Sequence, residues 1–170
     1  MNSSSHLHIS GHIVTNQLID NVDIMNRRNN CVGQVNSVSF CLSKLNASVR
    51  YKLFQSYCMS IYGCELWSLT NDKIDDLCIS WRRSLRRIFG LPYDTHCYIL
   101  PLLGQYLPLF DEICSRSLSF IKTCVQHKSK LIRAVANYGI RYGHHNSFLG
   151  HIALICAHRY KYTSRAHGSL

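Results

Sequence analysis

Apolar residues along most of this chain recur with the period of an α-helix. From Val22 onward they are spaced by three, four or seven positions, which places them on one helix face. The first series is Ile24, Cys31, Val35, Val38, Leu42 and Leu45, and the second is Val49, Leu53, Tyr57, Cys58 and Ile61. Residues 46–48 interrupt the pattern and offer a new N-cap, and the second series stops at Gly63. Residues 9–15, rich in β-branched side chains, predict one strand or the end of a hairpin.

The third predicted helix carries start and stop signals at its two ends. Asp72 is suited to the N-cap, and Asp75 and Asp76 fall in the first turn, where the helix dipole favours acids. Gly90 takes the position that commonly ends a helix, and Pro92 prevents continuation. The apolar residues of this helix lie within one arc of about 120°. They are Ile74, Leu77, Cys78, Trp81, Leu85, Ile88 and Phe89.

The remaining pattern predicts a linker and three more helices. The linker covers residues 91–107, a fourth helix runs from Pro108 to about His127, and two shorter helices cover residues 130–138 and 146–160. Gly139 and Gly143 are expected to separate the two shorter helices. The inward residues of the fourth helix are Ile113, Leu118, Ile121 and Val125. The predicted fold class is therefore mainly α, a helical bundle with at most one or two short N-terminal strands.

Positive charge is concentrated in the final third of the chain. The net charge is +10, from 19 Lys and Arg against 9 Asp and Glu. Residues 113–170 contain no acidic side chain, whereas residues 1–112 are almost balanced. An unbalanced positive block with interspersed tyrosines favours a polyanionic partner, of which nucleic acid is the commonest. The alternative is a charge excess that serves only solubility.

Four arginines on the solvent arc of the third helix form the candidate nucleic-acid contact: Arg82, Arg83, Arg86 and Arg87. No acid stands three or four positions before any of them, so no intrahelical ion pair of that spacing compensates them. Guanidinium groups match the oxygens of a phosphate backbone, which makes that backbone a fitting ligand. Cross-helix pairing with Glu65, Asp111 or Glu112 is the alternative. Secondary phosphate contacts are expected at Lys122, Lys128, Lys130 and Arg133.

No catalytic, metal-binding or cofactor-binding set of residues is predicted. Asp75 and Asp76 are neighbours in a helix, about 100° apart, so helix capping accounts for them better than a polymerase metal site does. His144, His151 and His158 recur every seven residues, about 10.5 Å along a helix, which is too far apart for one ion. Four further aromatic residues occupy core phases, where packing is favoured over base stacking: Tyr57, Tyr62, Trp67 and Trp81.

Cysteine usage and hydropathy predict an intracellular protein, cytoplasmic or nuclear, without membrane association. The nine cysteines are odd in number and include no CxxC pair, and no secretory signal is recognisable at residues 1–16. The longest uncharged stretch, residues 95–110, contains Pro101, Gly104 and Pro108, so it is a poor membrane span.

Several sequence blocks occur together between residue 11 and about residue 125. The most specific are Tyr62-Gly63-Cys64-Glu65-Leu66-Trp67 and Trp81-Arg82-Arg83-Ser84-Leu85-Arg86-Arg87-Ile88-Phe89-Gly90-Leu91-Pro92, followed by Thr95-His96. Residues 11–15, 34–36, 40, 53–58, 116 and 120 extend the match. In combination these blocks resemble the C-terminal, post-palm and thumb-like region of non-LTR (LINE-type) retrotransposon reverse transcriptases. The aromatic-Ala-Asp-Asp motif of that family has no counterpart in this sequence.

The resemblance implies three regions. Residues 1–20 would be a remnant of the palm and its primer-grip strand, residues 21–107 a thumb-like helical domain, and residues 108–170 a basic helical C-terminal extension. A fragment of an RNA-directed DNA polymerase without its catalytic aspartates is expected to catalyse nothing and to need no cofactor. Its residual property would be sequence-nonspecific binding to RNA or an RNA–DNA hybrid, with self-association through exposed apolar surface. The alternative is a non-enzymatic helical protein-interaction or scaffold module.

Overall fold

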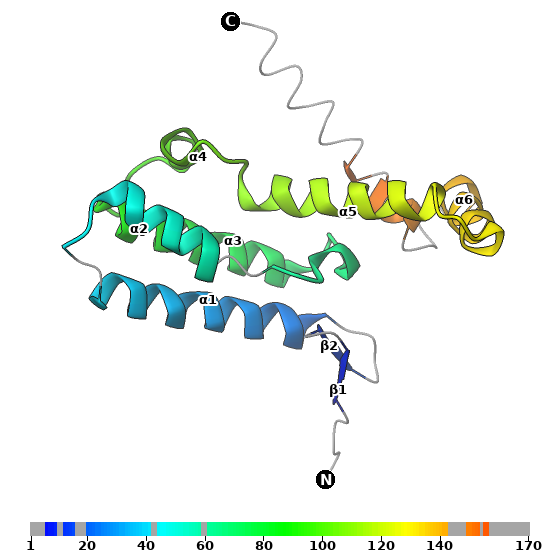
Figure 1. Cartoon of the computed structure of the whole chain (residues 1–170), viewed down its shortest axis with the longest axis horizontal. Helices are drawn as coiled ribbons and strands as arrows, with labels where there is room; N and C mark the ends of the chain where they lie inside the picture. The colour runs from blue at the N-terminus through cyan, green and yellow to red at the C-terminus, as the bar shows by residue number, and fades with distance from the viewer. Residues whose placement is uncertain are drawn as a thin grey trace, which may run out of the picture. The chain divides into compact units, whose positions relative to one another are not determined.

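The computed structural model describes residues 6–9, 12–15, 20–41, 44–58, 61–142, 149–153 and 155–156. Within these residues the chain is mainly helical, as predicted, with two short strands at the front (Figure 1). The strands are β1 (His6–Ile9) and β2 (His12–Thr15). The helical elements are α1 (Asn21–Cys41), α2 (Ala47–Leu53), the π-helical turn η1 (Phe54–Cys58), the 3-10 turn η2 (Cys64–Leu66), α3 (Asp72–Phe89), α4 (Ile99–Gly104), α5 (Leu109–Val125) and α6 (Lys130–Tyr142).

These elements form two compact units. The first comprises the described parts of Met1–Gly63 and Thr70–Phe110, and the second those of Cys64–Leu69 and Asp111–Leu170. In the described part of the chain, no helix combines the length and the apolar character needed to cross a bilayer.

The core of the first unit forms where α1 lies alongside α3 (Figure 1). The predicted inward arc of α3 is confirmed, because all of its members are buried except Phe89, which is half-buried. From α1, Ile24, Cys31 and Val35 are buried as predicted, whereas Leu45 is 39% exposed. Leu45 lies beyond the end of α1, so it no longer follows the helical period; Leu42 lies outside the described residues. Each fully buried Leu or Ile contributes about 1.5–3 kcal/mol to the folding free energy.

The ends of α3 follow from local capping chemistry. The N-cap is Asn71 rather than the predicted Asp72, because the Asn71 side chain accepts a hydrogen bond from the backbone N–H of Lys73 at 2.9 Å. At the other end Gly90 has φ +68°, the left-handed conformation that residues other than glycine adopt with strain. The N–H of Leu91 donates to the carbonyl of Arg86 at 2.8 Å, which closes the helix end as predicted.

Helix α2 begins where predicted but buries a different face. Asn46 is the N-cap and accepts a hydrogen bond from the N–H of Ser48 at 3.1 Å. Val49 is 44% exposed, so its predicted inward position is wrong. Cys58 and Ile61, which follow α2, are buried as predicted, and within α2 and the start of η1 the buried residues are Tyr51 and Phe54. Both faces carry apolar residues, and the one with the larger rings is buried because it removes more apolar surface from water.

An aromatic cluster joins α2, α3 and the linker. The Tyr51 ring stacks on Phe89 with centroids 5.3 Å apart and on Tyr106 at 5.4 Å, and Tyr106 meets the edge of Trp81 at 5.0 Å. A Cβ at Gly104 would lie 1.9 Å from the Tyr106 ring, so this position requires glycine. Residues 99–104 of the predicted linker form α4, which brings Tyr106 into the core.

Of the four aromatic residues assigned to core phases, Trp67 and Trp81 are buried as predicted. The assignment is wrong for Tyr57 and Tyr62, which are 65% and 61% exposed. Tyr57 lies on the exposed side of η1, whereas Phe54 and Cys58 are buried, and Tyr62 lies in a turn where helical periodicity does not apply.

The N-terminal strands form an antiparallel hairpin in which His6 pairs with Thr15 and Ile9 with His12. The hairpin is attached to α1 through Asp23, whose side chain is fully buried. The Asp23 carboxylate accepts a hydrogen bond from the N–H of Ile13 at 3.1 Å and lies 3.7 Å from the Arg27 guanidinium. A buried carboxylate needs such partners because an unpaired buried charge is costly.

The second unit is built on α5 and α6. Pro108 immediately precedes α5, and Ile113 and Ile121 are buried as predicted, whereas Leu118 and Val125 are half-buried. The predicted break at Gly139 is wrong, because α6 continues through it to Tyr142. A glycine inside a helix costs only about 1 kcal/mol, which continued packing offsets. Residues 149–153 and 155–156 are helical, and the Cys156 thiol donates to the Cys114 carbonyl at 3.7 Å.

Candidate nucleic-acid interface

The C-terminal half of α3 presents its four arginines on the side opposite to its buried arc. Arg83 and Arg87 are exposed, and Arg82 and Arg86 are half-buried. These positions are interspersed with Trp81, Leu85 and Ile88, which follow one another at spacings of four and three residues and anchor the helix in the core. The same periodicity that buries the apolar arc therefore holds the guanidinium groups at the surface.

Three of the four arginines bond to neutral oxygens. Arg86 donates twice to the backbone carbonyl of Thr95, at 3.0 and 2.7 Å. Arg83 donates to the Tyr93 hydroxyl at 3.2 Å, and Arg87 donates to the Asn36 side-chain oxygen on α1. Neutral acceptors orient a guanidinium without cancelling its charge. The helix therefore carries four net positive charges within two turns, which we call the arginine face (Arg82, Arg83, Arg86 and Arg87).

No acidic side chain forms an ion pair with the arginine face in the part of the chain that the structure describes. The acids of α3 lie at its other end, and six residues of helix separate Asp76 from Arg82, the nearest of the four arginines, about 9 Å at 1.5 Å per residue. That distance exceeds the screening length of about 8 Å at physiological salt. In the adjoining loop, Asp94 is the one acidic residue between positions 90 and 110, and it is exposed.

Two of the acids considered for cross-helix pairing are placed around an arginine of their own unit. Glu112 forms an ion pair with Arg116 within α5, at 2.9 Å and with an i,i+4 spacing. Burial lowers the pKa of Arg116, but the hydrogen bond to Glu112 and the charges of Cys64, Glu112 and Glu65 outweigh it and raise the pKa above its usual value. Glu65 and Glu112 therefore hold the charged form of Arg116 in the second unit.

The secondary cations lie together around the junction between α5 and α6. All four side chains are exposed, in the last turn of α5, in the connecting turn and in the first turns of α6. They are Lys122, Lys128, Lys130 and Arg133. They form no ion pair with an acid among the described residues.

The acidic residues and histidines that were considered and rejected as catalytic or metal-binding lie at positions that capping or surface exposure explains. Asp75 and Asp76 are exposed near the start of α3, and Asp76 pairs with Lys73 at 3.2 Å. Of the three histidines that recur every seven residues, His151 is half-buried, while His144 and His158 lie outside the described residues. Across the described ranges, no group of three or more His, Cys, Asp or Glu side chains is placed to hold a metal ion.

The loop that adjoins the arginine face was not among the residues that the sequence indicates as functional. Tyr93 and Thr95 accept hydrogen bonds from Arg83 and Arg86, and Asn36 comes from a helix 51 residues away. Tyr93 could have been suspected, because a large ring directly after Gly90-Leu91-Pro92 is in a turn and cannot follow the helical core. Nothing local in the sequence indicates Asn36.

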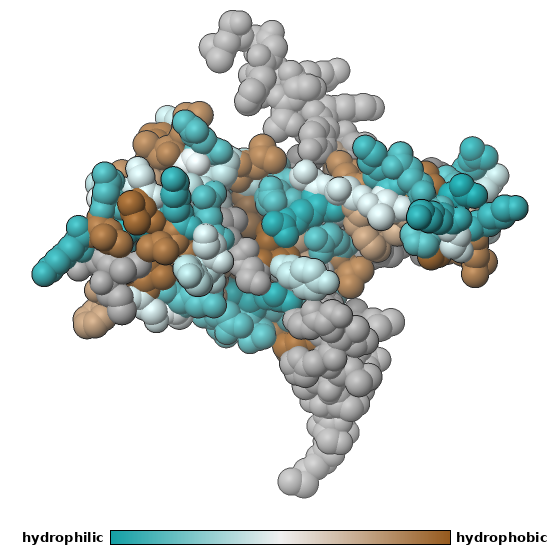
Figure 2. Space-filling view, viewed as in Figure 1, coloured by the Kyte–Doolittle hydropathy of each residue, from teal (hydrophilic) through white to brown (hydrophobic). Residues whose placement is uncertain are grey.

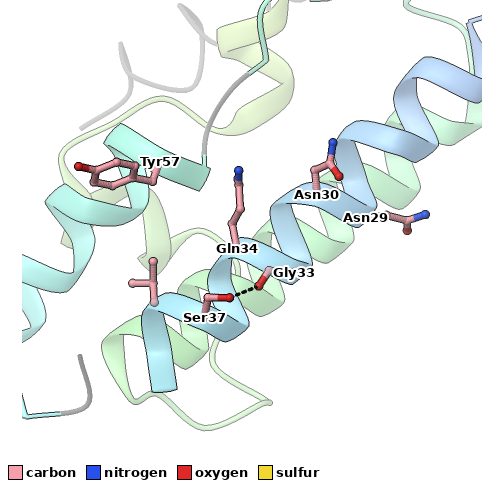
Figure 3. A pocket seen from close by; sticks show the side chains of 7 residues that line it. Asn29, Asn30, Gly33, Gln34, Ser37 and Tyr57 are labelled. Atoms are coloured by element: carbon pink, nitrogen blue, oxygen red, sulfur yellow. Dashed lines mark hydrogen bonds between the residues drawn. The ribbon is translucent and has the colours of Figure 1, made fainter. Parts of the chain in front are cut away.

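An open groove of about 490 Å³ runs beside α1 in the first unit (Figure 3). Its lining residues are uncharged and come from α1 and η1: Asn29, Asn30, Gly33, Gln34, Ser37, Val38 and Tyr57. The Ser37 hydroxyl donates to the Gly33 carbonyl at 3.2 Å, within the helix. Neutral amides and one ring offer hydrogen bonds but no acid, base or nucleophile for catalysis.

In comparisons with known proteins, no family model, no curated protein and no solved structure matches the chain.

Proposed function

We propose that this protein binds the sugar-phosphate backbone of nucleic acid through the arginine face of α3, without sequence preference and without catalysing a reaction. The observation that carries the proposal is that the described partners of Arg83, Arg86 and Arg87 are neutral oxygens, so their charge is oriented but not compensated. Neutralising phosphates with such side chains releases condensed counterions, which drives binding. We expect binding in the cytoplasm or nucleus, where nucleic acid and reduced thiols coexist.

The experiment is a salt titration of binding to a labelled RNA–DNA hybrid, followed by fluorescence anisotropy. For duplexes, log K falls with log salt by about 0.9 for each phosphate contacted. Replacing all four arginines of the face with Gln should flatten that slope, whereas replacing all four with Lys should largely keep it. A charge-matched comparison replaces the secondary contacts Lys122, Lys128, Lys130 and Arg133 with Gln, which should flatten the slope less than the arginine variant does. An unchanged slope in the arginine variant contradicts the proposal, provided far-UV circular dichroism shows a folded protein.

We further propose that the chain derives from the thumb-like region of a LINE-type reverse transcriptase. The sequence blocks that resemble this family include α3, so the arginine face and the family-like block coincide. The test is the genomic reading frame upstream of Met1. A palm with the Asp-Asp motif in that frame, or frameshifted from it, supports this origin; a locus with unrelated upstream sequence contradicts it.

An exposed apolar stripe on α6 favours a second candidate function, a protein-interaction module. Leu131, Val135, Tyr138 and Tyr142 are between 60% and 73% exposed and recur at helical spacing. Figure 2 shows hydrophobic and hydrophilic residues side by side over α6. Monomeric proteins seldom expose contiguous apolar patches larger than a few hundred Å², and such patches commonly mark contact sites. Self-association that persists in high salt, measured by sedimentation without nucleic-acid binding, would favour this module over the arginine face.

A further inference from the structure

Three aromatic rings stand at the surface of the loop that follows α3. Tyr93 is 73% exposed and Tyr98 is 66% exposed, and His96 between them is exposed as well. A ring that keeps most of its surface in water contributes little to the stability of the core. These rings therefore have no structural role comparable to that of Tyr51 or Tyr106 in the buried cluster.

The Tyr93 ring contacts the arginine face. The guanidinium carbons of Arg83 and Arg86 lie 5.8 and 5.9 Å from its centroid, within the distance at which a cation is attracted to a ring. Arg83 also donates to the Tyr93 hydroxyl. The ring is thus held next to two positive charges while most of its surface remains accessible.

The loop that carries the rings is fixed by hydrogen bonds of its backbone. Arg86 donates twice to the Thr95 carbonyl, and the N–H of Thr95 donates to the Pro92 carbonyl at 3.2 Å. A further backbone bond runs from Ile99 to the His96 carbonyl at 3.2 Å. The His96 and Tyr98 rings stack on each other with centroids 5.4 Å apart and planes inclined by 23°. Rings held in this way lose little conformational entropy when a ligand binds.

We propose that Tyr93 and the stacked pair His96–Tyr98 form a base-stacking site for single-stranded nucleic acid. This inference rests on the proposed function, since the phosphates of the same strand would contact the arginine face. Proteins that bind single strands combine cationic groups with aromatic rings, because every base has a flat face on which a ring can stack. In a duplex those faces are covered by neighbouring base pairs. The site therefore selects unpaired bases, in RNA or DNA, over paired ones.

One side chain in the loop opposes this site. Asp94 is exposed and lies between Tyr93 and His96 in the sequence, so its carboxylate would repel the phosphates of a bound strand. Asp94→Asn should therefore tighten binding of both base-bearing and abasic strands by the same small factor. An unequal effect would mean that Asp94 acts on the bases and not on the backbone.

The test compares three labelled probes of equal length: oligothymidine, an abasic strand with the same phosphates, and a blunt duplex. Wild-type protein should bind oligothymidine about five- to 150-fold more tightly than the abasic strand, the range expected for one stacked base. In the double variant Tyr93→Ala with Tyr98→Ala that ratio should fall to near one, while affinity for the abasic strand stays close to wild type. Tyr93→Trp should keep the ratio. Tyr62→Ala, an exposed tyrosine outside the loop, is the matched control.

A second readout separates stacking from a general loss of structure. A strand containing 2-aminopurine should change its fluorescence on binding to wild type and to Tyr62→Ala but not on binding to the double variant. Equal affinity of wild type for oligothymidine and the abasic strand overturns the stacking site while leaving the arginine face in place. If the arginine-to-Gln variant binds every probe as wild type does, the proposed function itself fails, and the stacking site fails with it.

Discussion

The buried cluster around Tyr106 gives a prediction in which two chemically identical substitutions have opposite effects. The Tyr106 hydroxyl is buried and has no hydrogen-bond partner, although its ring stacks on Tyr51 and contacts the edge of Trp81. The Tyr51 hydroxyl, in contrast, accepts a hydrogen bond from the Gln55 amide at 2.9 Å. Removing each hydroxyl while keeping the ring therefore tests the burial of a polar atom with and without a partner.

The magnitudes follow from these contacts. A buried polar group without a partner costs about 1–3 kcal/mol, so Tyr106→Phe should raise the free energy of unfolding by about 1 kcal/mol or more. Tyr51→Phe removes a satisfied hydrogen bond, worth about 0.5–1.5 kcal/mol. The lower end applies because Gln55 is exposed and its amide can bond to water instead. The two variants should thus differ by about 1.5–2 kcal/mol, with wild type between them.

Urea unfolding followed by circular dichroism measures both effects in one assay. The midpoint should move up for Tyr106→Phe and down for Tyr51→Phe, with the slope m unchanged in each. For a chain of this size, 1 kcal/mol corresponds to a shift of roughly 2–4 °C in Tm. Tyr62→Phe, at an exposed ring, should stay within about 0.5 kcal/mol of wild type. A loss of stability in Tyr106→Phe would refute the reasoning, because it would mean that the hydroxyl is satisfied in the folded protein.

Three further predictions concern the helix cap, alkaline pH and thiol reactivity. Asn71→Ala should destabilise the protein by about 1 kcal/mol, and Asp72→Ala by clearly less, because Asn71 bonds the helix N-terminus; equal losses in chemical denaturation would contradict this cap. Burial raises the pKa of Tyr51 to about 12 from 10.0. The stability that the neutral Tyr51 side chain contributes is therefore complete below pH 10 and is lost as pH rises toward 12. The urea midpoint should fall between pH 10 and pH 12, and it should fall less in Tyr51→Phe. Exposed Cys97 should react with a thiol reagent at pH 8 long before Cys31, whose pKa burial raises to about 11; mass spectrometry that finds Cys31 modified first would contradict the packing of α1.

Local chemistry made α3 predictable from the sequence. Its inward arc, its start within one residue and its end at Gly90 all follow from side-chain periodicity and from capping groups within a few positions of each other. The arginine face is predictable for the same reason, since a helix that buries Leu85 and Ile88 must expose the residues between them. Its role in binding nucleic acid stays a prediction.

The predictions from the sequence are wrong for elements that pack against residues far away along the chain. Two faces of α2 carry apolar side chains, and the choice between them depends on the rings of Phe89 and Tyr106, which lie far along the chain. The sequence predicts a linker where α4 forms, because Pro101 and Gly104 break the periodic pattern. Gly104 is nevertheless needed there, since the Tyr106 ring occupies the space of a Cβ.

The residues of the candidate site can be divided in the same way, into those that the sequence predicts and those that only the tertiary structure shows. The sequence alone places four arginines on one helix face without an intrahelical acid, because that depends only on the helical period. Only the tertiary structure decides that Arg86 fixes the loop through Thr95, that Arg87 meets Asn36 from another helix, and that Tyr93 lies against two guanidinium groups. These contacts join residues from 7 to 51 positions apart, as set by the packing of α1, α3 and the loop. Side-chain periodicity carries no information about such distances.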